Sequence, residues 1–145
     1  MTTINAPLES RRPNEDTGQY LARLFEEGFN NEETWRIEQL VAEHFMDHGP
    51  YVGGADFRQR LQTVRGVLPD AVLHVDEVIR QGDFIATRWT VTGTHRGKTL
   101  GVEPTGKTVT LSGMSVERLK DGKVIEHWEF PDLKGFAEQI EADVA

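Results

Sequence analysis

The amino-acid sequence predicts an α+β fold, in which helices pack on one face of a curved, mostly antiparallel sheet. In the first half of the chain, apolar residues recur every three or four positions, which is typical of helices. In the second half, apolar and polar residues alternate, and turn residues separate the alternating segments. Helices followed by a run of strands indicate an α+β arrangement, and the length of 145 residues suits a single domain.

The helices are expected to come first, behind a polar segment. Residues 1–16 contain two prolines and show no periodicity, so we expect a flexible N-terminal tail ahead of one domain over residues 17–145. The first helix should begin at Thr17 as its N-cap and end at the two asparagines that follow Phe29. Two further helices are expected over residues 32–45 and 56–67.

Four strands and a short helix are expected to follow. Residues 121 and 122 are Asp-Gly, a strong hairpin signal, and lie between the last two strands. The predicted strands cover residues 71–79, 84–94, 109–119 and 124–130, and the closing helix covers residues 133–140.

Composition excludes several kinds of partner and chemistry. The net charge of −8 disfavours nucleic acid and anionic lipid surfaces, because both are polyanions. The absence of cysteine excludes disulfides, thiolate metal sites and a cysteine nucleophile. No apolar run approaches the length of a membrane span, and residues 1–12 lack the apolar stretch of a signal peptide. We therefore expect a cytoplasmic location.

Two motifs suggest chemistry that their surroundings do not support. Residues 101–108 have the spacing of a phosphate-binding loop, but a strand pattern follows where the motif needs a helix, and Glu103 would repel phosphate. His44 and His48 would share a face of the second helix, but zinc usually requires three or four protein ligands. We therefore predict an ordinary loop and no metal site.

The last predicted strand carries the strongest candidate for catalysis. Alternation places Ile125, His127 and Glu129 on one face. If that face borders an apolar cavity, burial would raise the pKa of the carboxyl group toward neutrality, which suits a general acid or base. The simpler alternative is a cross-strand charge pair at the surface.

The strand over residues 84–94 is compatible with such a cavity. Trp89 shares a face with Thr87 and, at the strand end, with His95, whereas Arg88 points to the other side. Trp89 is either a cavity wall or an ordinary core residue. Gly113, inside the next strand, suggests a bulge or bend.

Several segments together resemble one protein family over residues 17–140. They are residues 86–95 (ATRWTVTGTH), 100–107 (LGVEPTGK) and 121–128 (DGKVIEHW), with residues 45–48 and the helix of Phe57 in the first half. In these segments the chain resembles the SnoaL-like polyketide cyclases, or ester cyclases, of the nuclear transport factor two-like superfamily.

The resemblance implies a cone-shaped fold with one deep pocket and an intramolecular aldol condensation that needs neither metal nor cofactor. The cyclases use an aspartate two residues after a histidine on the last strand. These positions are Glu129 and His127 here, so a longer carboxylate side chain replaces aspartate. A pocket histidine of the cyclases falls at Ser115. Family members associate through the outer face of the sheet, which implies a homodimer or homotetramer that uses Trp128, Arg88 and Thr90.

We therefore expect a cofactor-free enzyme that acts on an apolar carbonyl compound such as a polyketide. Glu129 would remove a proton from the carbon next to a carbonyl group, and a histidine would bind the carbonyl oxygen. The candidate histidines are His127, His95 and His48. The remaining expected pocket residues are Trp89, Phe57, Phe25 and Leu111.

Two alternatives stay open. A cofactor-free hydroxylase or an epoxide hydrolase would use the same fold. Epoxide opening needs a water molecule held by carboxylates, such as Asp132 and Glu129, with an arginine linking them, but Arg88 points away. A non-catalytic binding protein would instead have an ionised and exposed Glu129.

Overall fold

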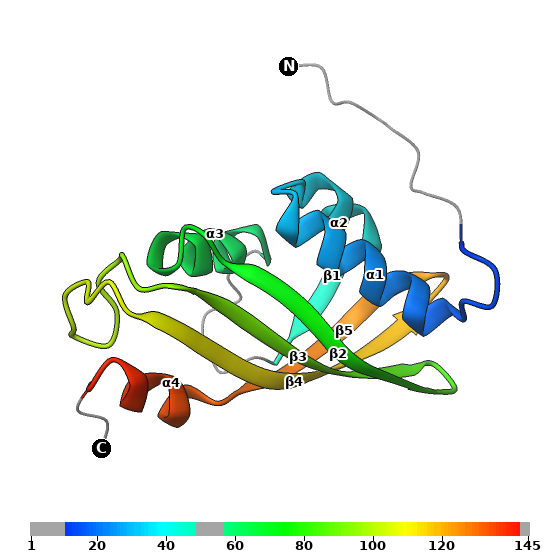
Figure 1. The fold of residues 1–145 in the computed structure, drawn as a ribbon. Coiled ribbons are helices and arrows are strands. Elements are labelled where there is room, and N and C mark those ends of the chain that lie inside the picture. The colour runs from blue at the N-terminus through cyan, green and yellow to red at the C-terminus, as the bar shows by residue number, and fades with distance from the viewer. Residues whose placement is uncertain (1–10, 49–56, 143–145) are drawn as a thin grey trace, which may run out of the picture.

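A computed structural model of the chain describes residues 11–48 and 57–142, with side chains in the second stretch from residue 59 onward. Four helices and one five-stranded sheet make up this part of the molecule (Figure 1). The α+β prediction is confirmed. Most of the predicted N-terminal tail and the start of the predicted third helix lie outside the described residues. None of the described helices is long and apolar enough to cross a membrane.

The first helix, α1 (Thr17–Asn30), begins with a cap that differs from the predicted one. Its N-cap is Asp16, whose carboxylate accepts a hydrogen bond of 2.8 Å from the backbone N–H of Gln19. The Gln19 side chain accepts in return from the backbone N–H of Asp16 at 3.0 Å. This reciprocal pair satisfies two donors at the helix start, so the prediction of Thr17 as N-cap was wrong by one residue.

The second helix is much shorter than predicted. It is α2 (Thr34–Leu40), and the chain then continues as the strand β1 (Val41–Asp47). The predicted helix over residues 32–45 was therefore wrong from Val41 onward. Its apolar residues are spaced as in a helix, but pairing with a strand some 80 residues later determines the conformation.

The remaining elements agree with their predictions to within two residues. The Asp121–Gly122 hairpin is confirmed, and both residues have positive φ, 53° and 77°, as a two-residue hairpin turn requires. The elements are α3 (Phe57–Val67), β2 (Val72–Gln81), β3 (Phe84–Thr94), β4 (Thr108–Lys120), β5 (Lys123–Pro131) and α4 (Leu133–Gln139).

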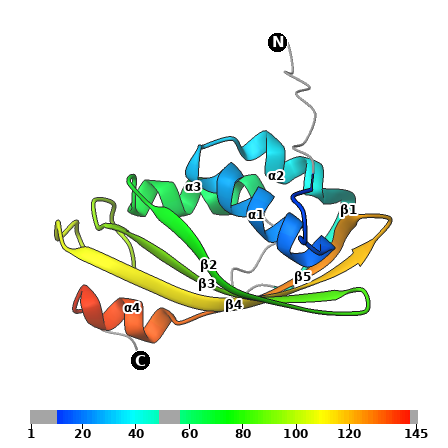
Figure 2. The same ribbon diagram turned by 45° about the vertical axis from the view of Figure 1, so that its right-hand side comes forward.

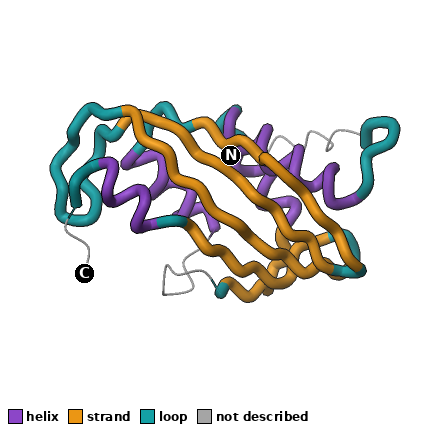
Figure 3. Tube along the Cα trace, turned by 60° about the horizontal axis from the view of Figure 1, so that its bottom comes forward, coloured by secondary structure: helices purple, strands orange, loops and turns teal. Residues whose placement is uncertain are grey.

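The sheet is curved and open, with strand order β1-β5-β4-β3-β2. Neighbouring strands are antiparallel except for β1 and β5, which are parallel. Helices α1, α2 and α3 cover one face, which we call the inner face, and α4 packs against β4 at one end (Figures 1 and 2). Figure 3 shows the opposite, outer face, where the strands lie uncovered over most of their length.

Strand register places three rows of side chains on the inner face, each crossing β3, β4 and β5. The first row is Trp89, Gly113 and Pro131. The second is Thr87, Ser115 and Glu129, and the third is Ile85, Glu117 and His127.

Gly113 was predicted to mark a bulge or a bend. The pairing of β3 with β4 runs without a shift through Gly113, so there is no bulge between these two strands. A Cβ atom at Gly113 would lie only 2.5 Å from the Trp89 ring. Glycine is therefore needed at this position because the indole packs directly over the backbone.

Candidate active site

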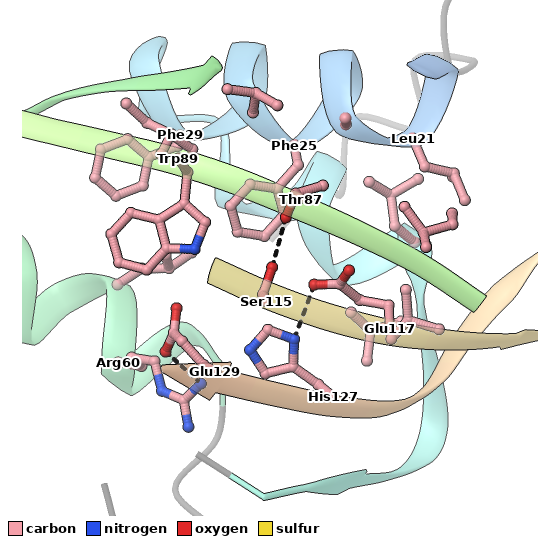
Figure 4. A pocket seen from close by; sticks show the side chains of 18 of the residues that line it. Leu21, Phe25, Phe29, Arg60, Thr87, Trp89, Ser115, Glu117, His127 and Glu129 are labelled. Carbon is pink, nitrogen blue, oxygen red and sulfur yellow. Dashed lines mark hydrogen bonds and ion pairs between the residues drawn. The ribbon is translucent and has the colours of Figure 1, made fainter. Parts of the chain in front are cut away.

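A cavity of about 130 Å³ lies between the inner face of the sheet and the helices. Its walls are mainly apolar and come from α1, α3 and the strands. Aromatic side chains form one part of the wall, and the polar side chains come from β3, β4, β5 and α3 (Figure 4). The aromatic residues are Phe25 and Phe29 of α1, Phe45 of β1 and Trp89 of β3.

Glu129 and His127 both line this cavity from β5. The alternation of the strand puts them on the same face, as predicted. The side chain of His127 is 6% exposed and that of Glu129 is 17% exposed. The alternative of a surface charge pair is therefore wrong for these two residues.

A second carboxylate holds the His127 ring. Glu117 of β4 lies directly opposite His127 in the register, and its Oε1 atom lies 3.0 Å from Nδ1 of the imidazole (Figure 4). A hydrogen bond to a carboxylate on one ring nitrogen fixes both the orientation and the tautomer of a histidine. The third row of the inner face thus presents an oriented imidazole to the cavity.

An arginine links Glu129 to a third carboxylate. Arg60 of α3 points into the cavity, and its Nη1 atom donates to Oε2 of Glu129 at 3.2 Å (Figure 4). The other terminal nitrogen, Nη2, forms an ion pair with Asp47 at the end of β1. The side chains of Arg60 and Asp47 are 9% and 7% exposed, so this ion pair is largely buried.

Burial and neighbouring charges raise the pKa of both groups on β5. For Glu129, burial raises the pKa, and this effect outweighs the opposite influence of the His127 and Arg60 charges. For His127, burial alone would lower the pKa. The hydrogen bond with Glu117, together with the negative charges around the ring, more than compensates, and the net pKa is raised.

Two hydroxyl groups form the polar part of the second row. Thr87 and Ser115 are buried, both line the cavity, and their side-chain oxygens are 2.6 Å apart (Figure 4). Ser115 lies directly opposite Glu129 in the register of β4 and β5.

The structure brings most of the predicted site residues together, but not all. Two of the three candidate histidines lie elsewhere, and the side chain of Phe57 is outside the described residues. The residues that line the cavity are Glu129, His127, Trp89, Ser115, Phe25 and Leu111.

His48 lies on the outer face, so its predicted place in the pocket is corrected. Its ring stacks on Trp128 with centroids 4.9 Å apart, and its Nε2 atom lies 2.7 Å from Glu126. Glu126 and Trp128 alternate with His127 and Glu129 along β5 and so face the other way.

His95 is fully buried beyond the end of β3, outside the cavity lining. Its Nδ1 atom lies 2.9 Å from Oγ1 of Thr105, and this contact ties the two ends of the β3–β4 loop together. Its predicted place in the pocket is therefore also corrected.

Arg88 points outward, as alternation predicted, and pairs with Asp76 and Glu77. Asp132 caps α4, where its carboxylate accepts from the backbone N–H of Gly135 at 2.9 Å.

Three charged residues of the site were missed at the sequence level. A signal for Arg60 was present, because it falls within the apolar stripe that includes Leu61 and Val64 of α3. Alternation along β4 places Glu117 on the same face as Ser115. Asp47 gave no such signal, because its strand was interpreted as a helix.

No metal-binding cluster is found in the described residues, since no three histidine or acidic side chains are grouped to hold an ion. The histidine pair that suggested a metal site does not share a helix face, because His44 belongs to β1 and His48 follows it.

Comparison with known proteins finds relatives among polyketide cyclases. The sequence model of the SnoaL-like polyketide cyclase family matches residues 19–140. Nogalonic acid methyl ester cyclase from Streptomyces nogalater is 24% identical over 118 residues, which cover 77% of this chain and 88% of that protein. Aklanonic acid methyl ester cyclase DauD from Streptomyces sp. (strain C5) is 21% identical over 127 residues, covering 83% of this chain and 79% of DauD.

Solved structures share the fold. AclR from Streptomyces galilaeus, which carries a provisional assignment as a hydroxylase, has a TM-score of 0.77 and 26% identity, covering 86% of this chain and 85% of AclR. TsrD from Streptomyces laurentii has a TM-score of 0.78 at 22% identity, over 88% of this chain and 96% of TsrD. The similarity to TsrD shows a common fold alone.

Proposed function

The chain belongs to the SnoaL-like polyketide cyclase family, and we propose that it is an enzyme of general acid–base type that acts on an apolar carbonyl compound such as a polyketide. The observation that carries the proposal is the position of Glu129. Its carboxyl group lies in an apolar cavity beside an oriented histidine, and burial raises its pKa. A carboxylate with a raised pKa is a stronger base than one in water.

The proposed reaction is an intramolecular aldol condensation that ends at the aldol adduct, without loss of water. Ionised Glu129 removes a proton from the carbon next to a carbonyl group. The charge that develops on the carbonyl oxygen is stabilised by a hydrogen bond from His127, whose raised pKa favours the doubly protonated ring. The enolate carbon attacks a second carbonyl carbon of the same molecule and forms a C–C bond. Protonation of the new alkoxide by the carboxyl group of Glu129 returns the base, so substrate and product are isomers.

This chemistry uses only side chains of the protein, so the proposed reaction requires no cofactor. Glu117 serves as a positioning residue, because its hydrogen bond fixes the His127 ring. Arg60 is a second positioning residue. It restrains the Glu129 carboxylate, and its charge opposes the rise in the pKa of Glu129 caused by burial.

A second candidate function is the opening of an epoxide or a related bond by water. The observation that favours it is the bridge formed by Arg60 between Asp47 and Glu129. This chemistry was expected to need an arginine that links two carboxylates. Arg88 was considered for this role, but in the structure Arg60 makes the link. A hydroxylase remains a further alternative because of the similarity to AclR. The third alternative, a non-catalytic binding protein, predicted an exposed Glu129, whereas the side chain is largely buried.

The first experiment measures proton abstraction directly. We expect the protein to accelerate exchange of the α-protons of 2-tetralone with deuterium from D₂O, followed by proton NMR. Glu129→Gln should lower the rate by about 10²–10⁴-fold, the usual contribution of a general base. Cyclisation of nogalonic acid methyl ester and aklanonic acid methyl ester, the compounds named for the two relatives, is then tested with the same variants.

Glu126→Gln is the matched control, because Glu126 lies on the same strand and faces the other side of the sheet. It should leave the exchange rate of the folded protein unchanged. An exchange rate that is equal in wild type and Glu129→Gln would exclude Glu129 as the base. Acceleration of epoxide hydrolysis without acceleration of exchange would favour the second candidate function.

We also propose that two copies of the chain associate through the outer face of the sheet, and that the protein acts in the cytoplasm. The support for association is the row of side chains formed by Arg88, Met114 and Phe130 across β3, β4 and β5. Met114 and Phe130 are 50% and 67% exposed, and apolar exposure of this kind in one place is typical of contact surfaces.

A further inference from the structure

We propose that Ser115, assisted by Thr87, forms a binding subsite for a neutral carbonyl oxygen of the substrate, next to the base. The inference deepens the proposed function and rests on it in one respect, namely that the cavity takes an apolar carbonyl compound. It adds a recognition element that is separate from His127.

The first observation is that the hydroxyl groups of Thr87 and Ser115 lie beside Glu129. Thr87, Ser115 and Glu129 form one row across three neighbouring strands, and all three side chains line the cavity. Directly opposed side chains in an antiparallel pair have Cβ atoms about 4.5–5.5 Å apart. A ligand oxygen bound at Ser115 therefore lies within a few bonds of a carbon that faces Glu129 (Figure 4).

The second observation is that one of the hydroxyl hydrogens of the pair has no acceptor in the described part of the chain. The two hydroxyl groups have two hydrogens, and their mutual contact of 2.6 Å uses one of them. Within residues 11–48 and 57–142, neither hydroxyl makes a further hydrogen bond. Ser115 and Thr87 are 4% and 9% exposed, so bulk water is not at hand. A buried donor without an acceptor is unfavourable, and a ligand oxygen would satisfy it.

The direction of the hydrogen bond between the two hydroxyl groups follows from their positions in the second row. We assign Thr87 as the donor to Ser115, which leaves the Ser115 hydrogen for the ligand, because Ser115 lies nearer to the base. A hydroxyl that accepts one hydrogen bond becomes a better donor in the next. Thr87 is thus a positioning residue, and Ser115 makes the contact.

The charges around the cavity determine the class of ligand. The site holds three acidic side chains and two basic ones. The acidic residues are Glu117, Glu129 and Asp47, and the basic residues are Arg60 and His127. A ligand carboxylate would therefore add negative charge where acidic groups already predominate. A cation gains nothing from a hydroxyl donor. A neutral ketone or ester oxygen is the acceptor that fits, and it is held by a single hydrogen bond in otherwise apolar surroundings.

The test compares two small ligands, acetophenone and ethylbenzene, in which a C=O group of the first replaces a CH₂ group of the second. Their Kd values are measured by amide NMR titration of the wild type, Ser115→Ala and Ser112→Ala. Ser112 lies on the same strand but is exposed on the outer face, so it is the matched control. The ratio of the two Kd values cancels the common apolar contribution. We expect Ser115→Ala to shift this ratio against acetophenone by about threefold to tenfold, as loss of one hydrogen bond predicts, and Ser112→Ala to leave it unchanged.

Two further variants extend the test. Thr87→Val should shift the ratio in the same direction but by less than Ser115→Ala. Ser115→Cys, which has a similar volume and a weak donor, should behave like Ser115→Ala and serves if the alanine variant does not fold. The amide spectrum itself reports folding.

An unchanged ratio in Ser115→Ala and Ser115→Cys would overturn the subsite, as would an equal shift in Ser112→Ala. If neither ligand binds the wild type, the subsite and the proposed substrate class both fail. The proposed base is judged separately by deuterium exchange with Glu129→Gln. The subsite can thus fail while Glu129 remains necessary for exchange, and Glu129 can fail while the Kd ratio still responds to Ser115.

Discussion

At the scale of single residues, the site holds a carboxyl group where ionisation is unfavourable. Glu129 reaches a cavity lined mainly by apolar side chains, and its pKa is raised above the usual glutamate value of 4.5. The folded protein therefore holds the proton more tightly than the unfolded chain does. This difference links the chemistry of the site to the stability of the fold.

The raised pKa of Glu129 predicts how the free energy of unfolding changes with pH. At pH values well below 4.5 both states are protonated, and the contribution of Glu129 to stability is fully present. As the pH rises from there through the raised pKa, the unfolded chain ionises first and that contribution is lost. Glu129→Gln cannot ionise, so we expect it to increase the free energy of unfolding at neutral pH by about 0.5–2 kcal/mol, the usual gain of a stabilising substitution.

Urea denaturation of both proteins between about pH 4 and pH 8 measures this difference. The gap between variant and wild type should widen as the pH rises. Glu126→Gln is expected to act in the opposite direction, because hydrogen bonds from Arg118 and His48 lower the pKa of Glu126. If Glu129→Gln destabilises the protein equally at every pH, the carboxyl group does not have a raised pKa.

Sequence reasoning found the two residues on β5 and missed the charged groups that hold them. Alternation along one strand is a local pattern, and it correctly placed His127 and Glu129 on the same face. The partners come from α3, β4 and β1, and only the folded sheet brings Arg60, Glu117 and Asp47 to the same place. Their positions gave a signal for Arg60 and Glu117 and none for Asp47, and that signal did not outweigh the expectation that a charged residue is solvated.

At the scale of elements, short turns fix the register that aligns the inner rows. The β4–β5 hairpin turns at Asp121 and Gly122, both with positive φ. β4 and β5 carry Ser115, Glu117, His127 and Glu129, so the geometry of the cavity depends on this hairpin.

Gly122→Ala should therefore destabilise the protein by about 1 kcal/mol, because a side chain disfavours this backbone conformation. Gly66→Ala is the matched control, since Gly66 lies in α3 without positive φ and a Cβ atom added there would meet no other atom within 4 Å. Alanine there should leave stability unchanged or raise it. Thermal unfolding measures both, and a Gly122→Ala protein as stable as wild type would contradict the assigned turn.

The element that sequence reasoning misassigned is β1. Its residues, Val-Ala-Glu-His-Phe-Met-Asp, do not alternate and continue the helical spacing of α2. The strand exists because it pairs in parallel with β5, and such pairing with a distant segment leaves no local signal. The strands β2 to β5 form consecutive antiparallel pairs, and these were predictable from turns and alternation.

At the scale of the whole molecule, the two faces of the sheet differ in their covering. Helices cover the inner face, whereas the strands lie uncovered over most of their length on the outer face (Figure 3). Three large apolar side chains of that face, Phe84, Met114 and Phe130, are 45%, 50% and 67% exposed. A second copy of the chain on this face would bury them without touching the cavity.

We expect the wild type to be a dimer at micromolar concentration and Phe130→Lys to be a monomer. Arg88 is paired with acidic residues of its own chain, whereas a lysine at position 130 would bring one unpaired charge from each copy into the contact. Light scattering coupled to size exclusion measures the mass. Leu100→Lys, at an exposed position in the β3–β4 loop, is the control and should remain dimeric. A monomeric wild type would contradict the proposed association.

The place of β5 in the sheet also determines when the site can come into being. β5 is the last of the five strands to leave the ribosome, yet it lies between β1 and β4 rather than at an edge. The nascent chain can pair β2, β3 and β4 in sequence. β1 is synthesised before them but has no partner strand until β5 is made. The edge of β1 is open to unwanted pairing during that interval. The late insertion of β5 between β1 and β4 completes the sheet and brings His127 and Glu129 to the cavity. A chain that stalls before residue 131 therefore lacks both the complete sheet and the complete site.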